Sequence, residues 1–176
     1  MVHWLALVVV LLSLDVVWTA SASEPRWEAS ADVGGVHTVG SDPVFDWAVC
    51  GGGSLLLRLR QRFGVGVFAA YRQILDSAPA SSFWYADIGA RVRFSFTERL
   101  WLRMDTGWSF RHIGMRDGYS NTVSGFMAGT GLGVIVLARP KWNLSLAAAY
   151  HVTWRTQSEV FSTQDMGLSM AWTRWW

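Results

Sequence analysis

The stretch from Trp84 to Phe96 reads WYADIGARVRFSF and alternates strictly between two kinds of side chain. Every even-numbered position from Trp84 to Phe96 is apolar. The odd-numbered positions hold Tyr85, Asp87, Gly89, Arg91, Arg93 and Ser95. In a β-strand, side chains two residues apart lie on the same face, whereas a helix would mix the two sets on every side. The stretch therefore predicts a β-strand with one wholly apolar face.

The same two-residue period recurs along the chain and predicts eight strands. They are expected at residues 26–37, 47–59, 63–74, 83–96, 100–112, 122–137, 142–155 and 163–176. The links alternate between short ones, at 60–62, 97–99 and 138–141, and longer ones, at 38–46, 75–82, 113–121 and 156–162. This alternation predicts an all-β, eight-stranded antiparallel up-and-down barrel with both chain termini at the short-turn end. The run Gly51-Gly52-Gly53 predicts a bulge or a sharp bend within the second strand.

Composition and charge exclude several classes of protein. The chain is 51% apolar and only 16% charged, against about 25% charged in a typical soluble domain. The net charge of +2 is small and evenly spread, so no nucleic-acid partner is expected. A single cysteine, Cys50, excludes a disulfide framework and a cysteine-based zinc site. The four histidines lack metal-ligand spacing, so no cofactor and no metal are expected.

The amino-terminal segment has the layout of an export signal. An apolar run from Trp4 to Leu14, broken by Ser13, precedes the small residues Ala20-Ser21-Ala22. This layout is typical of a secretory signal peptide. A short membrane anchor is the alternative, but a run of this length that ends at Asp15 spans a bilayer poorly. We therefore expect a signal peptide at 1–22 and a single β-barrel domain at 23–176.

The uncharged apolar faces distinguish a membrane barrel from a soluble one. A soluble barrel of the lipocalin kind turns its apolar face inward around a ligand, whereas a membrane barrel turns it outward to lipid. About 9–11 tilted residues cross the hydrocarbon layer, and most of the predicted strands are at least that long. Aromatic residues also gather near both strand ends, as expected of two membrane-interface belts. The predicted interface aromatics are Trp47, Tyr71, Trp84, Trp108, Trp142, Trp154, Trp172 and Trp176.

The opposite faces of the strands carry charges of both signs, which predicts an ion-pair network inside the barrel. Its expected members are Glu28, Asp32, Arg58, Arg72, Asp87, Arg91, Arg93, Arg103, Asp105, Arg111, Arg155 and Asp165. If the turn at 97–99 sets the register, Arg91 lies opposite Asp105, and across the last hairpin Arg155 is expected to meet Asp165. Buried charges need such partners, and arginine can hold a carboxylate with two hydrogen bonds.

These patterns resemble the small eight-stranded outer-membrane barrels of Gram-negative bacteria, the OmpA/OmpX type. The resemblance includes the last strand, in which Met166, Leu168, Met170, Trp172 and Trp176 alternate up to a terminal aromatic residue. It implies a location in the outer membrane, contact with outer-membrane lipids, and recognition of the C-terminal strand by the barrel-assembly machinery.

Three classes of function fit these features. The first is a structural or surface-interaction barrel with a filled lumen and four longer loops that meet a surface partner. The second is a narrow conduit for ions or small hydrophobic molecules, for which glycine rows such as Gly129, Gly131 and Gly133 would leave space; close packing around large side chains is the alternative reading of these rows. The third is a lipid A deacylase or acyltransferase, for which the candidate pairs are His112 with Ser120, or His151 with Thr153 and Glu159. The first class is favoured because eight strands enclose a space that side chains can fill, so no catalytic residues are assigned.

Overall fold

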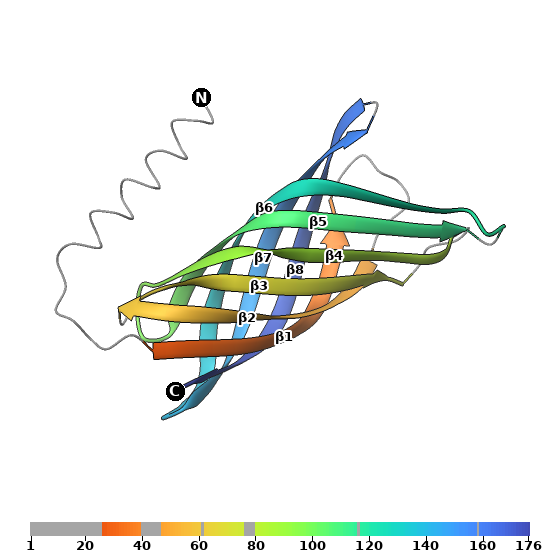
Figure 1. Ribbon diagram of the computed structural model, residues 1–176. Coiled ribbons are helices and arrows are strands. Elements are labelled where there is room, and N and C mark those ends of the chain that lie inside the picture. Colours follow the sequence, from red (N-terminus) through yellow and green to blue (C-terminus); the bar gives the residue numbers. More distant parts are fainter. Residues whose placement is uncertain (1–25, 40–46, 61, 76–79, 116, 158) are drawn as a thin grey trace.

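The computed structural model is a closed antiparallel β-barrel of eight strands in chain order (Figure 1). The structure describes residues 26–39, 47–60, 62–75, 80–115, 117–157 and 159–176. The strands are β1 (Arg26–Thr38), β2 (Trp47–Arg60), β3 (Phe63–Ile74), β4 (Ala80–Ser95), β5 (Leu100–Met115), β6 (Ser120–Arg139), β7 (Trp142–Gln157) and β8 (Glu159–Trp175). The predicted signal peptide at 1–22 lies outside the described residues.

Closure is achieved by pairing of the first strand with the last. β1 and β8 are antiparallel neighbours from Glu28 opposite Trp175 to Thr38 opposite Asp165. A closed barrel leaves no strand edge with unpaired backbone groups, which is the condition for crossing a lipid layer with strands. The predicted all-β up-and-down barrel is confirmed.

At the long-loop end of the barrel, strands β5 to β8 are longer than the sequence predicts. β5 and β6 pair up to Gly114 opposite Ser120, and β7 and β8 pair up to Gln157 opposite Glu159. The predicted loops at 113–121 and 156–162 are therefore wrong in length, since most of their residues belong to paired strands. Backbone pairing between adjacent strands continues past the point where the apolar alternation fades, because ladder hydrogen bonds do not depend on side-chain polarity.

The strand register is regular at the glycine run, and the register shifts lie at other places. Gly51, Gly52 and Gly53 pair in unbroken register with both β1 and β3, so the predicted bulge there is wrong. Register shifts occur instead between Arg58 and Arg60 and between Ile135 and Leu137. At Gly52 an added Cβ would lie 2.7 Å from the carbonyl oxygen of Ala69 and 3.0 Å from Oδ1 of Asp32. The glycine run thus accommodates close neighbours rather than a bulge.

The barrel is apolar outside and polar inside. Large apolar side chains on the outer face are well exposed, for example Val67 at 60% and Leu168 at 71%. Charged residues that face inward are buried, for example Glu28 at 1% and Asp105 at 3%. This is the inversion expected of a barrel solvated by lipid. Among the described residues, no helix has the length and apolar character needed to cross a bilayer.

Candidate functional site

The lumen contains three groups of ion pairs stacked along the barrel axis. The group nearest the short turns is centred on Glu28 of β1. Its carboxylate accepts a hydrogen bond from Arg93 of β4 and lies 3.0 Å from Nε of Arg58 on β2. The guanidinium of Arg93 also lies over the ring of Trp101, 4.7 Å from its centroid. The arrangement stabilises a buried carboxylate with two cations from different strands.

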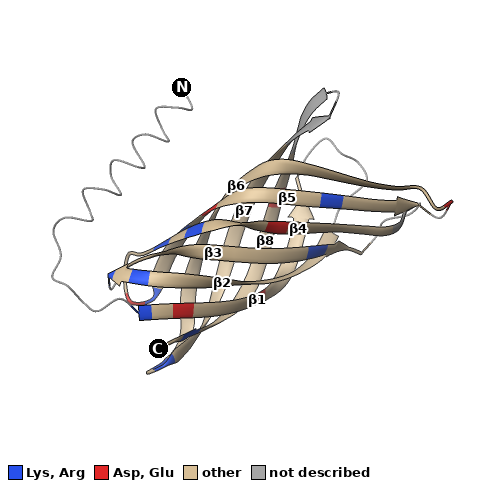
Figure 2. Cartoon of the chain, viewed as in Figure 1, with Lys and Arg blue, Asp and Glu red and all other residues tan. Residues whose placement is uncertain are grey.

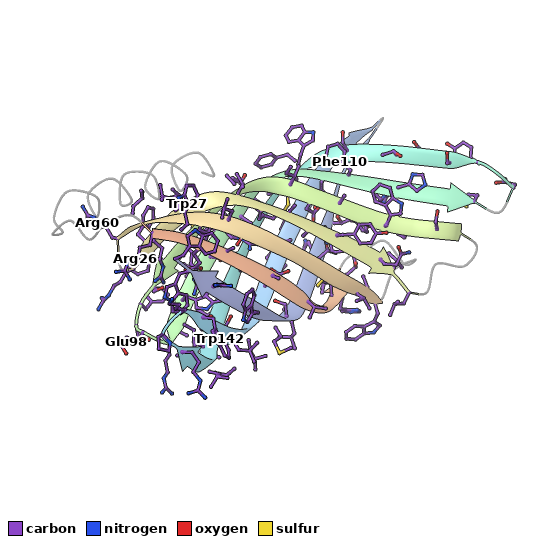
Figure 3. All side chains as sticks on the ribbon, turned by 60° about the horizontal axis from the view of Figure 1, so that its bottom comes forward. Arg26, Trp27, Arg60, Glu98, Phe110 and Trp142 are labelled. Carbon is purple, nitrogen blue, oxygen red and sulfur yellow. The ribbon has the colours of Figure 1, made fainter. Side chains whose placement is uncertain are left out.

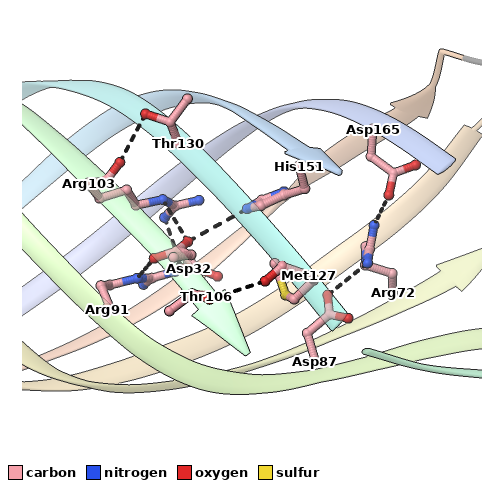
Figure 4. A network of polar contacts seen from close by, with 11 residues as sticks. Asp32, Arg72, Asp87, Arg91, Arg103, Thr106, Met127, Thr130, His151 and Asp165 are labelled. Carbon is pink, nitrogen blue, oxygen red and sulfur yellow. Dashed lines mark hydrogen bonds and ion pairs between the residues drawn. The ribbon is translucent and has the colours of Figure 1, made fainter. Parts of the chain in front are cut away.

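The middle group is centred on Asp105 of β5 (Figure 4). Arg91 donates two hydrogen bonds to this carboxylate, from Nε to Oδ1 at 2.7 Å and from Nη2 to Oδ2 at 2.9 Å. Nε of Arg103 lies 3.4 Å from Oδ2, and Nε2 of His151 lies 3.6 Å from the same oxygen. Asp32 lies between the two arginines, 4.0 Å from Nη1 of Arg91 and 3.9 Å from Nη1 of Arg103.

The third group lies toward the long loops and is centred on Arg72 of β3 (Figure 4). Arg72 bridges two carboxylates, with Nη2 at 2.8 Å from Oδ2 of Asp87 and Nη1 paired with Oδ2 of Asp165. Thr38 donates a second hydrogen bond to Asp165, from Oγ1 to Oδ1 at 2.9 Å. The Arg72 guanidinium lies over the ring of Tyr85, 4.7 Å from its centroid. These contacts tie β3, β4, β8 and β1 together across the lumen.

An apolar cluster lies on the inner faces of β1 to β4, next to this third group. It consists of the buried side chains Val36, Ala48, Ile74, Phe83 and Tyr85. Cys50 and Ile113 pack against it and are partly buried.

Large side chains fill the space beside the glycine row of β6. An added Cβ at Gly129 would collide with the ring of His151, and one at Gly133 would collide with the indole of Trp101. At Gly131 it would lie 2.9 Å from Nε of Arg103. Two lumen cavities lined by ion-pair residues measure about 50 and 20 Å³, and a water molecule needs roughly 10–15 Å³. The glycines therefore serve close packing, with room beside them for a few water molecules.

The arginines and the acids of the three groups are equal in number. The arginines at 58, 72, 91, 93 and 103 balance the acids at 28, 32, 87, 105 and 165. The short-turn group carries an excess of one positive charge and the Arg72 group an excess of one negative charge, while the middle group is balanced. A neutral, hydrogen-bonded network is the arrangement in which buried charges cost least. Chemically it holds the wall strands together and offers little free volume to a solute.

Most of the residues predicted for the network meet there, with one pairing wrong. Arg91 lies opposite Asp105 as predicted. The register places His151, not Arg155, opposite Asp165, because Arg155 pairs with Phe161. The partner of Asp165 is Arg72 from the far side of the barrel. Arg111 lies over Phe83, 5.7 Å from its centroid, and the side chain of Arg155 lies outside the described part of the structure.

Several lumen residues escaped the sequence analysis because they are apolar. Trp101, Phe68, Leu56 and Met127 are each at most 4% exposed. Trp101 shares its strand parity with Arg103 and Asp105, and Phe68 shares its parity with Arg72. Their odd or even position along the strand, which they share with the charged lumen residues, was therefore the signal that they face inward. Because they are apolar, they resemble the residues of the outer face, and this signal was missed.

The predicted interface aromatics all have outward parity. Trp47, Tyr71, Trp108, Trp154, Trp172 and Trp176 are exposed, and Trp84 and Trp142 are half-buried. Toward the long loops, the rings of Trp108, Phe126 and Trp154 form a row across three strands, with centroids 6.0 and 5.9 Å apart. Trp84 likewise lies between Tyr71 and His112, at 5.9 and 5.0 Å. Each row gives the outer face a continuous aromatic surface.

The histidines proposed as catalytic bases have other partners. Nδ1 of His112 lies 3.0 Å from Oγ1 of Thr122, which is the residue opposite it on β6, while Ser120 lies opposite Gly114. His151 contacts Asp105 in the lumen. Thr153 is fully buried, and the side chain of Glu159 lies outside the described residues. The candidate pair of His112 with Ser120 is therefore not brought into direct opposition by the register.

Solved structures of bacterial surface barrels share this fold. Neisserial surface protein A matches with 17% identity and a TM-score of 0.59 over 88% of this chain and 99% of that chain. Ail, the attachment invasion locus protein of Yersinia pestis, matches with 14% identity and a TM-score of 0.59 over 86% of this chain and 99% of that chain. The N-terminal β-barrel domain of Pseudomonas aeruginosa OprF matches with 12% identity and a TM-score of 0.52 over 83% of this chain and 96% of that chain. No protein-family model and no curated protein sequence matches the chain.

The fold is therefore that of the small eight-stranded outer-membrane β-barrels. The predicted resemblance to the OmpA/OmpX type is confirmed at the level of the fold, over nearly the full length of the solved barrels. The identities are low, so the shared property is architecture, and the function has to be argued from the residues of this chain.

Proposed function

We propose that this chain is a closed outer-membrane barrel with a structural and surface-interaction role. The observation that carries the proposal is the filled lumen, in which balanced ion pairs and an apolar cluster occupy the space between the strands. In this proposal residues 1–22 direct export and are removed. The barrel-assembly machinery reads the last strand, whose outward row runs from Met166 to Trp176, and lipid covers the outer face.

The outer surface supports contact with membrane lipid. Exposed apolar residues cover the outer face between the aromatic residues near the two strand ends. Examples are Val33, Ile88, Leu132 and Leu146. Exposing this much contiguous apolar surface to water is unfavourable, by roughly 25 cal/mol for each Å². A hydrocarbon environment removes this cost, and the rings at both ends fit the headgroup level.

The long-loop segments suggest the chemistry of a surface partner. The sequences at this end of the barrel, namely 38–46, 75–79, 116–119 and the tip of the β7–β8 hairpin at 156–162, contain the acids Asp42, Asp46, Asp76, Asp117 and Glu159 against one basic residue, Arg116. Ail has been crystallised in complex with the heparin analogue sucrose octasulfate, with 15% identity to this chain and a TM-score of 0.55. Acidic segments repel a polyanion. The partner proposed here is therefore a cationic or metal-bridged surface rather than a sulfated sugar.

Conduction and lipid A chemistry are less well supported. The lumen cavities lined by the middle ion pairs hold about 50 and 20 Å³, which favours a filled lumen over a conduit. The histidine named with Ser120 as a catalytic pair is hydrogen-bonded to Thr122 instead. Planar-bilayer recording of the purified protein tests the first alternative, and mass spectrometry of lipid A from expressing cells tests the second. Steady channel openings or a changed number of acyl chains would replace the proposal.

The central experiment is expression of the full-length protein in a Gram-negative host. Outer membranes are run on a detergent gel with and without boiling, and the mass of the mature chain is determined. We expect a heat-dependent change in migration and a mass that corresponds to a start at Ser23. Recovery of the protein as soluble periplasmic material without such a change would refute the membrane assignment.

A further inference from the structure

Basic side chains gather at the short-turn end of the barrel. Within the described residues this end carries Arg26, Arg60, Arg62, Arg99, Arg139, Lys141 and Arg174. The acid described on the surface there is Glu98. Figure 2 shows blue segments where the short turns and the C-terminus lie, and Figure 3 places Arg26, Arg60, Glu98 and Trp142 together at that end. The end thus has a positive surface, opposite in sign to the long-loop segments.

On the outer face of β6, β7 and β8, two of these arginines flank a tryptophan. Arg139 of β6 lies opposite Trp142 of β7, and Trp142 lies opposite Arg174 of β8. Adjacent strands are separated by about 4.8 Å, so the two arginines stand about 10 Å apart with the tryptophan between them. Lys141 lies in the turn beside this row and is exposed, as are both arginines. We call Arg139, Trp142, Arg174 and Lys141 the basic row.

A bulge in β6 turns Arg139 outward. Odd-numbered residues of β6 such as Val123 and Met127 face the lumen and are buried. The register shifts between Ile135 and Leu137, so that Leu137 pairs with the outward residue Leu144 and Arg139 pairs with Trp142. Without the extra residue in the bulge, Arg139 would face the lumen like the other odd-numbered residues of β6. The backbone irregularity therefore places a second cation on the face that already carries Arg174.

An apolar groove lies on the same outer face, further from the short turns. It has a volume of about 610 Å³ and is lined by Val134, Leu146, Met170, Leu132 and Leu168, with Ala148 as a small residue among them. Val134, Leu146 and Met170 form one cross-strand row over β6, β7 and β8. These are the three strands that carry the basic row. The volume falls in the range of about 300–1,000 Å³ typical of small-molecule sites.

The distance between the basic row and the apolar groove, measured along the membrane normal, corresponds to the hydrocarbon thickness of one lipid leaflet. Ala148 follows Trp142 by six residues on β7, which is about 20 Å along the strand. With a tilt of about 40° the depth is about 15 Å, and half of a hydrocarbon core of about 30 Å has the same thickness. A charged side chain on the lipid face is tolerated only near the interface. The basic row therefore marks the level of the lipid phosphates.

We propose that the basic row and the groove together bind one anionic glycerophospholipid in the leaflet at the short-turn side. Arg139, Arg174 and Lys141 surround the phosphate of a headgroup that carries no compensating positive charge, Trp142 lies at the glycerol level, and an acyl chain fills the groove. This inference rests on the proposed membrane location. It identifies the lipid class by charge, since a zwitterionic headgroup would leave the cations only partly neutralised.

Native mass spectrometry of the mature protein, released from detergent micelles, tests the proposal. Dioleoylphosphatidylglycerol and dioleoylphosphatidylcholine are offered at equal concentration, so that the acyl chains are the same. The wild-type protein is expected to retain the anionic lipid preferentially. The double variant Arg139→Gln/Arg174→Gln should lose about 25-fold in affinity for phosphatidylglycerol with little change for phosphatidylcholine, because each basic residue near a lipid surface contributes about a fivefold effect.

The matched control is Arg62→Gln/Arg99→Gln, which removes the same charge from the same end but away from the basic row. It should leave the preference nearly unchanged. Ala148→Trp, which fills the groove, should weaken retention of both lipids. Equal retention of the two lipids by the wild type, or equal losses in the two double variants, would overturn the proposal.

Each variant is also checked for heat-dependent migration on a gel. The single variants Arg139→Gln and Arg174→Gln, each expected to lose several-fold in affinity, keep the test valid if the double variant fails to fold. A wild-type protein without the heat-dependent change would refute the membrane barrel itself, whereas a folded barrel without lipid preference would refute only this site.

Discussion

Arg72 and Asp165 form a buried ion pair although 93 residues separate them in the chain. Arg72 lies on β3 and Asp165 on β8, so the pair crosses the lumen rather than a strand ladder. Arg72 also holds Asp87 of β4, and it is the cation between these two carboxylates. The barrel wall at this level is thus fixed by one guanidinium.

Replacing Arg72 by methionine should destabilise the barrel strongly. The change leaves two buried carboxylates without their cation, and loss of one partner of a buried pair costs about 3–5 kcal/mol. Urea unfolding in lipid vesicles, followed by the heat-dependent gel shift, measures the effect. Arg62→Met at the exposed short turn serves as control and should change stability by about 0.5 kcal/mol or less. Similar losses in the two variants would mean that the Arg72 pairs add nothing.

Arg91 and Asp105 should be energetically coupled. Each single change to leucine removes the nearest partner of a buried charge and leaves that charge with only its longer contacts, whereas the double change removes both charges at once. The double variant is therefore expected to be less destabilised than the sum of the singles, with a coupling of about 0.5–3 kcal/mol. A double-mutant cycle by urea unfolding gives this value. Additive effects would contradict the two-bond contact between these residues.

Gly133 and Trp101 should compensate for each other. Gly133→Leu forces a side chain into the space of the Trp101 indole, and overpacking of this kind costs about 1–3 kcal/mol. Adding Trp101→Ala opens that space and should restore part of the loss. The comparison is made by thermal midpoints of the gel shift for the two single variants and the double variant. If Trp101→Ala worsens Gly133→Leu, the glycine row has another role.

A lysine on the outer face should reveal whether lipid surrounds the barrel. Leu168 is 71% exposed near the middle of β8, and Leu168→Lys should cost about 2–4 kcal/mol in a bilayer. Leu75, 65% exposed at the long-loop end of β3, is the matched position, where Leu75→Lys should cost about 0–1 kcal/mol. Unfolding from vesicles compares the two. A neutral Leu168→Lys is the result expected of a water-soluble barrel and would contradict the proposed location.

The sequence by itself determined the strand count, the up-and-down order and the choice of faces. These properties follow from local rules, because side chains alternate along a strand and short links force antiparallel neighbours. The hairpin pair Arg91 and Asp105 was predictable for the same reason, since a tight turn at 97–99 sets their register. Strand ends on the long-loop side were not predictable, because pairing continued without apolar alternation.

The tertiary structure alone decided which charges meet across the lumen and what fills the space between them. Arg72 reaches Asp165, and Arg93 reaches Glu28, only because β1 closes on β8 and brings the inner faces of these strands close enough for an arginine and a carboxylate side chain to meet. The bulge that turns Arg139 outward is likewise a property of pairing between β6 and β7. Periodicity in the sequence assigns a residue to a face, but only closure of the sheet determines the distance between faces.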